Sequence, residues 1–119
     1  MYEYYGNMGK IVDGDTFDIE IDLGFKISNY IRFRMLGIDV YEVRLGKDTT
    51  EADKEKGLSA KAYLIDLFKE DTRVKVVSSK TGKYGRYLCE LYKYNDKTDE
   101  YDISIYELLM EKGYNKTDG

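Results

Sequence analysis

Hydrophobic and polar residues alternate along several short stretches of the chain, which predicts β-strands. Residues 16–23 place Phe17, Ile19 and their alternate neighbours on one face and mainly carboxylates on the other. Residues 30–36 repeat the pattern, with Arg34 on the polar face. A period of two residues is that of a strand with one buried face. Two further strands are predicted at residues 73–78 and 87–94.

A second periodicity, with apolar residues three or four positions apart, predicts two helices. The longer one covers residues 51–68, and Gly57 within it indicates that the regular helix starts near Leu58. Its apolar stripe consists of Ala60, Tyr63, Leu64, Leu67 and Phe68. Residues 103–112 fit a second, shorter helix, and Gly113 follows it where a C-terminal cap is expected.

The order of these elements predicts an α+β barrel rather than alternating β-α-β units. A chain of 119 residues suits one domain, so we expect residues 1–119 to form a single unit. The polar, tyrosine-rich beginning gives no clear pattern. Tyr2, Tyr4 and Tyr5 are compatible with either an ordered edge or a loose arm, so residues 1–8 and 114–119 are candidates for loose termini.

The amino-acid composition excludes several kinds of catalytic and metal-binding site. The chain has no histidine and a single cysteine, Cys89, which excludes serine–histidine and cysteine–histidine catalysis, histidine-ligated zinc and thiolate clusters. Catalysis would have to use carboxylates, arginine, lysine, tyrosine or a hard metal ion. The net charge of −4 counts against a protein that coats nucleic acid, but less against a metal enzyme.

Composition also bears on location and partners. The single cysteine favours a reducing compartment, and the first residues lack the layout of a signal peptide. We therefore expect a cytoplasmic protein, or a secreted one if a leader has been removed. No apolar run is long enough to cross a bilayer, so we expect no membrane partner. We also expect a monomer.

Two acidic clusters are the candidates for chemistry. The first is Asp-Gly-Asp-Thr at residues 13–16, and the second is Asp-Val-Tyr-Glu at residues 39–42. The carboxylates of Asp15, Asp39 and Glu42 are suitable ligands for calcium or magnesium. Calcium is favoured because it accepts irregular geometry and main-chain carbonyl ligands. Taken alone, the first cluster is equally typical of a simple turn.

Two arginines accompany these clusters. Arg34 lies on the polar face of a predicted strand and precedes Asp39 by five residues, and Arg86 follows a glycine. A guanidinium stays charged and can bind two phosphate oxygens at once. Taken singly, each arginine could equally form a surface ion pair with one of the 23 acidic residues.

The motifs together resemble the staphylococcal nuclease (thermonuclease) family. The similarity covers residues 11–113 and rests on four motifs in the same order. These are Ile-Val-Asp-Gly-Asp-Thr, an arginine before Asp-x-x-Glu, Gly-x-x-Ala at residues 57–60 and Tyr-Gly-Arg at residues 84–86. The resemblance implies a five-stranded OB-fold β-barrel with two helices packed on it. It also implies calcium-dependent hydrolysis of phosphodiester bonds in DNA and RNA.

The resemblance further implies a role for each matching residue. The metal ligands would be Asp15, Asp39 and the main-chain carbonyl of Val40, with Thr16 and Asp13 supporting them. Glu42 would be the general base that takes a proton from water. The phosphate-binding residues would be Arg34 and Arg86, with Lys83 and Tyr84 on a terminal phosphate of the bound nucleotide.

Several departures from the family pattern keep a second function open. Val40 stands where the best-known members carry threonine, and Tyr41 replaces their usual proline. Tyr106 stands where an asparagine is typical, and the segment between Thr16 and Arg34 is longer, which predicts an extended first hairpin. The chain also stops soon after the second predicted helix and is acidic. The alternative is a weak or inactive OB-fold module that binds nucleic acid or protein.

Overall fold

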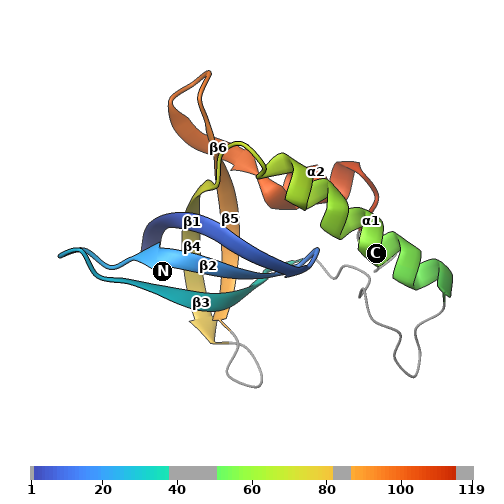
Figure 1. The fold of residues 1–119 in the computed structure, drawn as a ribbon, viewed down its shortest axis with the longest axis horizontal. Helices are drawn as coiled ribbons and strands as arrows, with labels where there is room; N and C mark the ends of the chain where they lie inside the picture. The colour runs from blue at the N-terminus through green and yellow to red at the C-terminus, as the bar shows by residue number, and fades with distance from the viewer. Residues whose placement is uncertain (1, 38–50, 82–86, 115–119) are drawn as a thin grey trace.

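The computed structural model describes residues 2–37, 51–81 and 87–114. Within these ranges the chain forms six strands and two helices (Figure 1). The strands are β1 (Tyr2–Asp13), β2 (Thr16–Asp22), β3 (Ser28–Met35), β4 (Arg73–Thr81), β5 (Tyr87–Asn95) and β6 (Glu100–Ser104). The helices are α1 (Glu51–Leu67) and α2 (Ile105–Glu111).

Five strands close into a barrel. The hydrogen-bonded order is β3-β2-β1-β4-β5-β6, and β3 pairs in addition with β5. This closing pair is parallel and joins Phe33 to Tyr87, Arg34 to Leu88 and Met35 to Cys89. The other pairings are antiparallel, and β6 extends the sheet beyond the ring. The prediction of an α+β, OB-fold-like barrel with two helices is therefore confirmed.

The alternating residues fill the barrel, as the sequence predicts. Phe17, Ile19 and Ile21 of β2 are buried, while the residues between them lie on the outer face. The same alternation buries Phe33 and Met35 on β3. The other buried apolar side chains on strands are Met8, Ile11, Val74, Val76, Cys89 and Leu91.

The first strand shows that the N-terminal segment is ordered and not a loose arm. Tyr2–Asn7 pairs with β4, and the second half of β1 pairs with β2. The pattern is obscured because Gly6 stands where β1 and β2 approach closely: a Cβ on Gly6 would lie 2.1 Å from the main-chain oxygen of Glu20. At the other terminus, Tyr114 packs on the core beside Tyr63.

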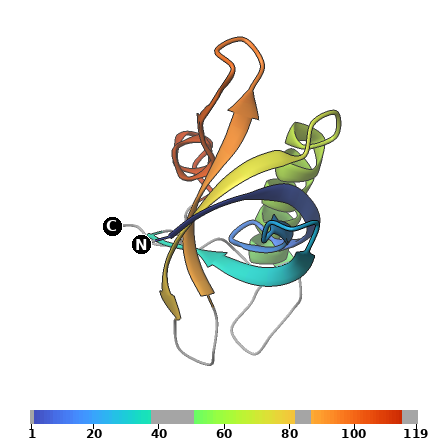
Figure 2. The same cartoon turned by 90° about the vertical axis from the view of Figure 1, so that its left-hand side faces the viewer.

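The long helix confirms the predicted stripe but not the predicted start. Ala60, Leu64 and Phe68 are buried in the core. The helix begins at Glu51 and passes through Gly57 without interruption. Gly57 is buried within the helix, although glycine lowers helix propensity. Helix α1 lies along one side of the barrel (Figure 2).

The short helix has a cap at each end. Ser104 ends β6 and caps α2, because its hydroxyl accepts a hydrogen bond from the Glu107 N–H at 3.2 Å. The helix therefore starts later than the predicted residue 103. At the other end Gly113 has φ +75°, and the N–H of Tyr114 donates to the Leu109 carbonyl at 3.0 Å. This pattern is the Schellman motif, which confirms the predicted glycine cap.

The β2–β3 hairpin extends well past the ring, as the long segment between Thr16 and Arg34 predicts. Its ladder reaches Asp22 paired with Ser28. Three successive residues at the tip, Gly24, Phe25 and Lys26, have positive φ angles. Phe25 is 97% exposed there. Among the described residues, no helix is long and apolar enough to cross a membrane.

Replacing Phe17 with alanine should destabilise the protein by about 3–5 kcal/mol, because this side chain is fully buried in the barrel. Phe25→Ala is the matched control. It removes the same atoms from an exposed tip and should change the free energy of unfolding by less than about 0.5 kcal/mol. Urea unfolding of both variants, followed by circular dichroism, measures the difference. Equal effects would contradict the described core.

Candidate functional site

The turn between β1 and β2 places a carboxylate inside the end of the barrel. Asp13 and Thr16 are paired across the turn, so Gly14 and Asp15 form its two central residues. Asp15 is only 3% exposed. The N–H of Met35 donates to the main-chain oxygen of Asp15 at 2.8 Å, which fixes the turn to the end of β3. The first cluster is therefore a turn and also a buried charged site.

Two other predicted site residues contact this carboxylate. The Thr16 hydroxyl donates to Asp15 Oδ1 at 3.0 Å. Arg34 Nη2 lies 3.4 Å from Asp15 Oδ2 and forms an ion pair with it. Thr16 and Arg34 are cross-strand partners in the β2–β3 ladder, which explains how residues distant in sequence meet here. A buried carboxylate is costly without such partners.

The closing β3–β5 pair sets the place of Arg34 in the fold. Arg34 is paired with Leu88, so it lies at the seam where the barrel closes. Tyr87 begins β5 and its ring lies 6.1 Å from that of Phe33. The N-terminal end of β5 is therefore held beside Arg34 and the buried Asp15.

The structure describes only part of the predicted site. Asp39, Val40, Glu42, Lys83, Tyr84 and Arg86 lie outside the described residues. Asp13 is described at the end of β1, where it pairs with Thr16. The residues that the structure does bring together are Asp15, Thr16 and Arg34.

The described part of the site provides oxygen atoms that can act as metal ligands. The carboxylate of Asp15 and the hydroxyl of Thr16 are the hard ligands that calcium accepts. Among the residues that the structure describes, no three histidine, cysteine, aspartate or glutamate side chains gather as a metal cluster. The donors that are described thus fit a hard cation, and any complete ligand set would need residues beyond them.

One contact near the site was not anticipated from the sequence. Gly37 has φ +79°, and a Cβ at this position would lie 3.3 Å from a ring carbon of Tyr106. The N–H of Leu36 donates to the Cys89 carbonyl at 2.8 Å. The chain is thus held by β5 and covered by α2 just before the second acidic cluster. The only signal in the sequence was the unusual tyrosine at position 106.

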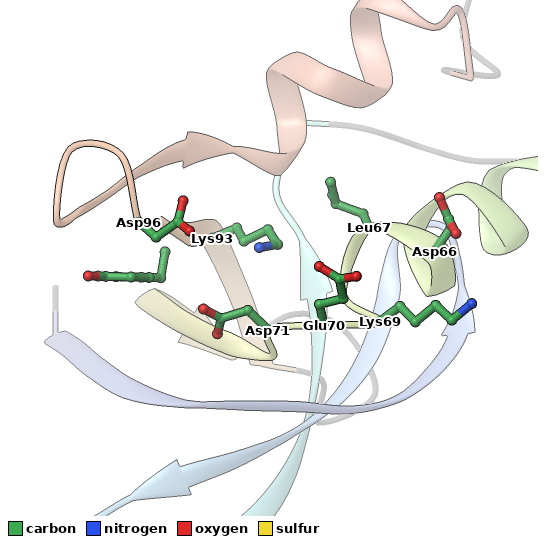
Figure 3. A pocket seen from close by; sticks show the side chains of 8 residues that line it. Asp66, Leu67, Lys69, Glu70, Asp71, Lys93 and Asp96 are labelled. Carbon is green, nitrogen blue, oxygen red and sulfur yellow. The ribbon is translucent and has the colours of Figure 1, made fainter.

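A separate cavity of about 450 Å³ lies where α1 passes into β4, beside the end of β5 (Figure 3). Its described lining consists of Asp66, Leu67, Lys69, Glu70, Asp71, Lys93, Tyr94 and Asp96. None of these is a predicted site residue. The side chain and N–H of Arg73 donate hydrogen bonds to Asp71, which lower the pKa of that carboxyl to about 2. Asp71 is therefore charged at neutral pH.

The single cysteine is buried, and its thiol stays protonated at neutral pH. Cys89 is fully buried on β5. Burial raises the pKa of its thiol to about 12, and the negative charge of Glu90 adds to the rise. The reactive form of cysteine is the thiolate, so this side chain acts as a small core residue.

Comparisons with known proteins identify a related protein but indicate no activity. No protein-family model matches the chain. The chain is 32% identical, over 127 residues, to the uncharacterized protein MJ1439 of Methanocaldococcus jannaschii. The alignment covers 93% of this chain and 58% of that protein. The chain thus spans less than two thirds of this relative.

We predict that Cys89 will not react with iodoacetamide in the native protein at pH 8, because the buried thiol stays protonated. The reaction should become complete in urea. Mass spectrometry of both samples measures the modified fraction. Rapid labelling of the native protein, without loss of its circular dichroism spectrum, would contradict the burial of this thiol.

Proposed function

We propose that this protein is a calcium-dependent nuclease of the staphylococcal nuclease type, which hydrolyses phosphodiester bonds of DNA or RNA. The observation that carries the proposal is the buried Asp15, held beside Thr16 and Arg34 at the closing seam of the barrel. A protein core tolerates a carboxylate poorly unless it is paired or binds a cation. A carboxylate can bind a cation, and an arginine can bind a phosphate. The two side chains together therefore suit a phosphate ester with its counter-cation.

The fold supports this proposal without deciding it. OB-fold barrels serve many unrelated functions, so the argument must rest on the site. The order of motifs in the sequence adds independent support. Asp15 and Arg34 come from different motifs of the resemblance, yet they form an ion pair in the structure.

In the proposed reaction, Asp15, Asp39 and the main-chain carbonyl of Val40 would hold the calcium ion. When bound, calcium would supply positive charge that orients the phosphate and stabilises its developing negative charge. Glu42 takes a proton from the attacking water, a contribution of roughly 10²–10⁴-fold.

The arginines would bind the non-bridging phosphate oxygens, where negative charge accumulates in the transition state. Arg34 starts from a defined position beside Asp15, and Arg86 directly precedes β5. Lys83 and Tyr84 would contact a terminal phosphate of the substrate. No histidine is needed for any of these steps, which agrees with the composition.

One structural observation favours the alternative of a binding module without turnover. The outer face of β2 carries the row Asp18, Glu20 and Asp22, which leads from Thr16 toward the hairpin tip. Asp18 is neutralised by Arg32, whose Nε and Nη2 donate to it at 2.7 and 3.0 Å. The remaining carboxylates and the net charge of −4 weaken the attraction for nucleic acid.

We expect the purified protein to cleave single-stranded DNA or RNA in calcium and to lose this activity in a chelator. Glu42→Gln should lower the rate at least 100-fold, because the general base is removed. Glu20→Gln is the matched control: it makes the same chemical change on the outer face of β2 and should retain activity. Gel analysis of labelled oligonucleotides measures all three proteins.

Two results would contradict the proposal. The first is that the wild-type protein, in calcium, cleaves the oligonucleotide no faster than Glu42→Gln does. The second is equal activity in calcium and in chelator. Tight oligonucleotide binding without cleavage would instead support the binding module.

A further inference from the structure

We propose that the free edge of β3 is an interface that joins two copies of this chain into a symmetric dimer. Residues 28–32 of β3 pair with β2 on one side. On the other side β5 pairs only with Phe33, Arg34 and Met35, so within the described ranges no strand lies along residues 28–32. This inference concerns assembly and holds whether or not the protein is a nuclease.

This edge lacks the protection that natural proteins usually give to an exposed strand. An unpaired edge presents main-chain N–H and C=O groups to other strands, and bulges, prolines or charged side chains normally prevent such pairing. The β2–β3 ladder has no register shift, and the chain contains no proline. The charged side chain within residues 28–32 is Arg32, and Asp18 of β2 holds its Nε at 2.7 Å. The edge is therefore regular and open to a second strand.

Two-fold symmetry fixes the register of such a dimer. If residues 28–32 pair along their full length with the same stretch of a second copy, the pairing is antiparallel and Tyr30 lies on the axis. Each residue then meets the one at the same distance beyond the axis. Tyr30 faces Tyr30 of the second copy, and Ser28 faces Arg32. Because Tyr30 is 62% exposed, this pairing removes a large aromatic surface from water.

The charges on the two hairpins are complementary in this register. Asp22 is the ladder partner of Ser28, and Asp18 is the ladder partner of Arg32. When Ser28 faces Arg32 of the second copy, the small serine leaves that guanidinium between its own Asp18 and Asp22 of the first copy. Opposite charges on neighbouring strands stabilise a sheet, and no two like charges face each other along residues 28–32.

The proposed dimer also gives a role to the exposed apolar side chains of the hairpin tip. Phe25 is 97% exposed and Ile27 is 57% exposed. This end of the hairpin points away from both helices (Figure 1). In the proposed register Ile27 reaches the level of Phe33 of the second copy, where β5 begins with the exposed Tyr87. The tip of each copy thus covers apolar surface at the closing seam of the other.

The first test is sedimentation velocity of the wild-type protein over a range of concentrations. The paired stretch is short, and interfaces that bury less than about 1,200 Å² are typical of transient complexes. We therefore expect the sedimentation coefficient to rise toward that of a dimer between about 10 µM and 1 mM. Such a dimer would replace the monomer expected from the sequence. A monomer throughout this range would overturn the proposal.

The same measurement on charged variants tests the position of the axis. Tyr30→Lys and Tyr30→Glu each place two like charges face to face, so each should raise the dissociation constant about tenfold. An equimolar mixture of the two should dimerise again, because lysine then faces glutamate. Tyr2→Lys is the matched control, since Tyr2 is 70% exposed but pairs with β4. Undiminished dimerisation of both Tyr30 variants, or no recovery in the mixture, would overturn the proposal.

The second test is disulfide trapping. The native Cys89 is buried and its thiol stays protonated, so a mild oxidant such as copper phenanthroline acts on an introduced cysteine. Tyr30→Cys should form a covalent dimer, because directly opposed Cβ atoms of an antiparallel pair lie about 4.5–5.5 Å apart. Phe25→Cys is the control: this position is more exposed, but the two tips lie at opposite ends of the interface. Equal yields of covalent dimer from both variants, seen on a non-reducing gel, would indicate random collision and contradict the proposed register.

Discussion

The parallel pairing of β3 with β5 is the constraint on which the rest of the structure depends. Without it the strands would form an open sheet with two unprotected edges. With it the barrel closes and the interior becomes dry enough to bury residues such as Phe17 and Ile19 completely. The same seam carries Arg34, so the closure of the fold and the position of the candidate site have one cause.

The buried Asp15 shows how a small barrel accommodates a charge. Its carboxylate receives the Thr16 hydroxyl and the Arg34 guanidinium, and its main-chain oxygen receives the N–H of Met35. These partners, among the described residues, come from β2 and β3. The charge therefore depends on the register of this hairpin: a shift by one residue would turn Arg34 toward the core and Phe33 toward solvent.

Local periodicity predicted the elements that bury one face and expose the other. It identified β2, β3 and the stripe of α1 because their inward residues recur at the period of a strand or a helix. It missed β1, where Gly6 serves a close approach to β2 and contributes no hydrophobic signal. It also misjudged Gly57, which lies buried within a continuous helix despite its low helix propensity.

The sequence predicted residues of the site but not the contacts between them, because local patterns do not specify tertiary structure. Asp15 and Arg34 were named from motifs, but their contact depends on the β2–β3 ladder, which no local pattern specifies. The cover that Tyr106 provides over Gly37 depends on the packing of α2, and it was not predicted. Motifs name residues well, whereas distances between them come from the fold.

The closing β3–β5 pair also affects the order in which strand pairs form during protein synthesis. Arg34 pairs with Thr16 of β2 and also with Leu88 of β5, so its full set of ladder pairings needs β5. A ribosome makes the chain from the N-terminus, and pairings between distant segments form late. The nascent chain therefore carries Asp15 and Arg34 without a closed barrel around them. The pairing of Arg34 with Leu88 therefore forms only after β5 has been synthesised.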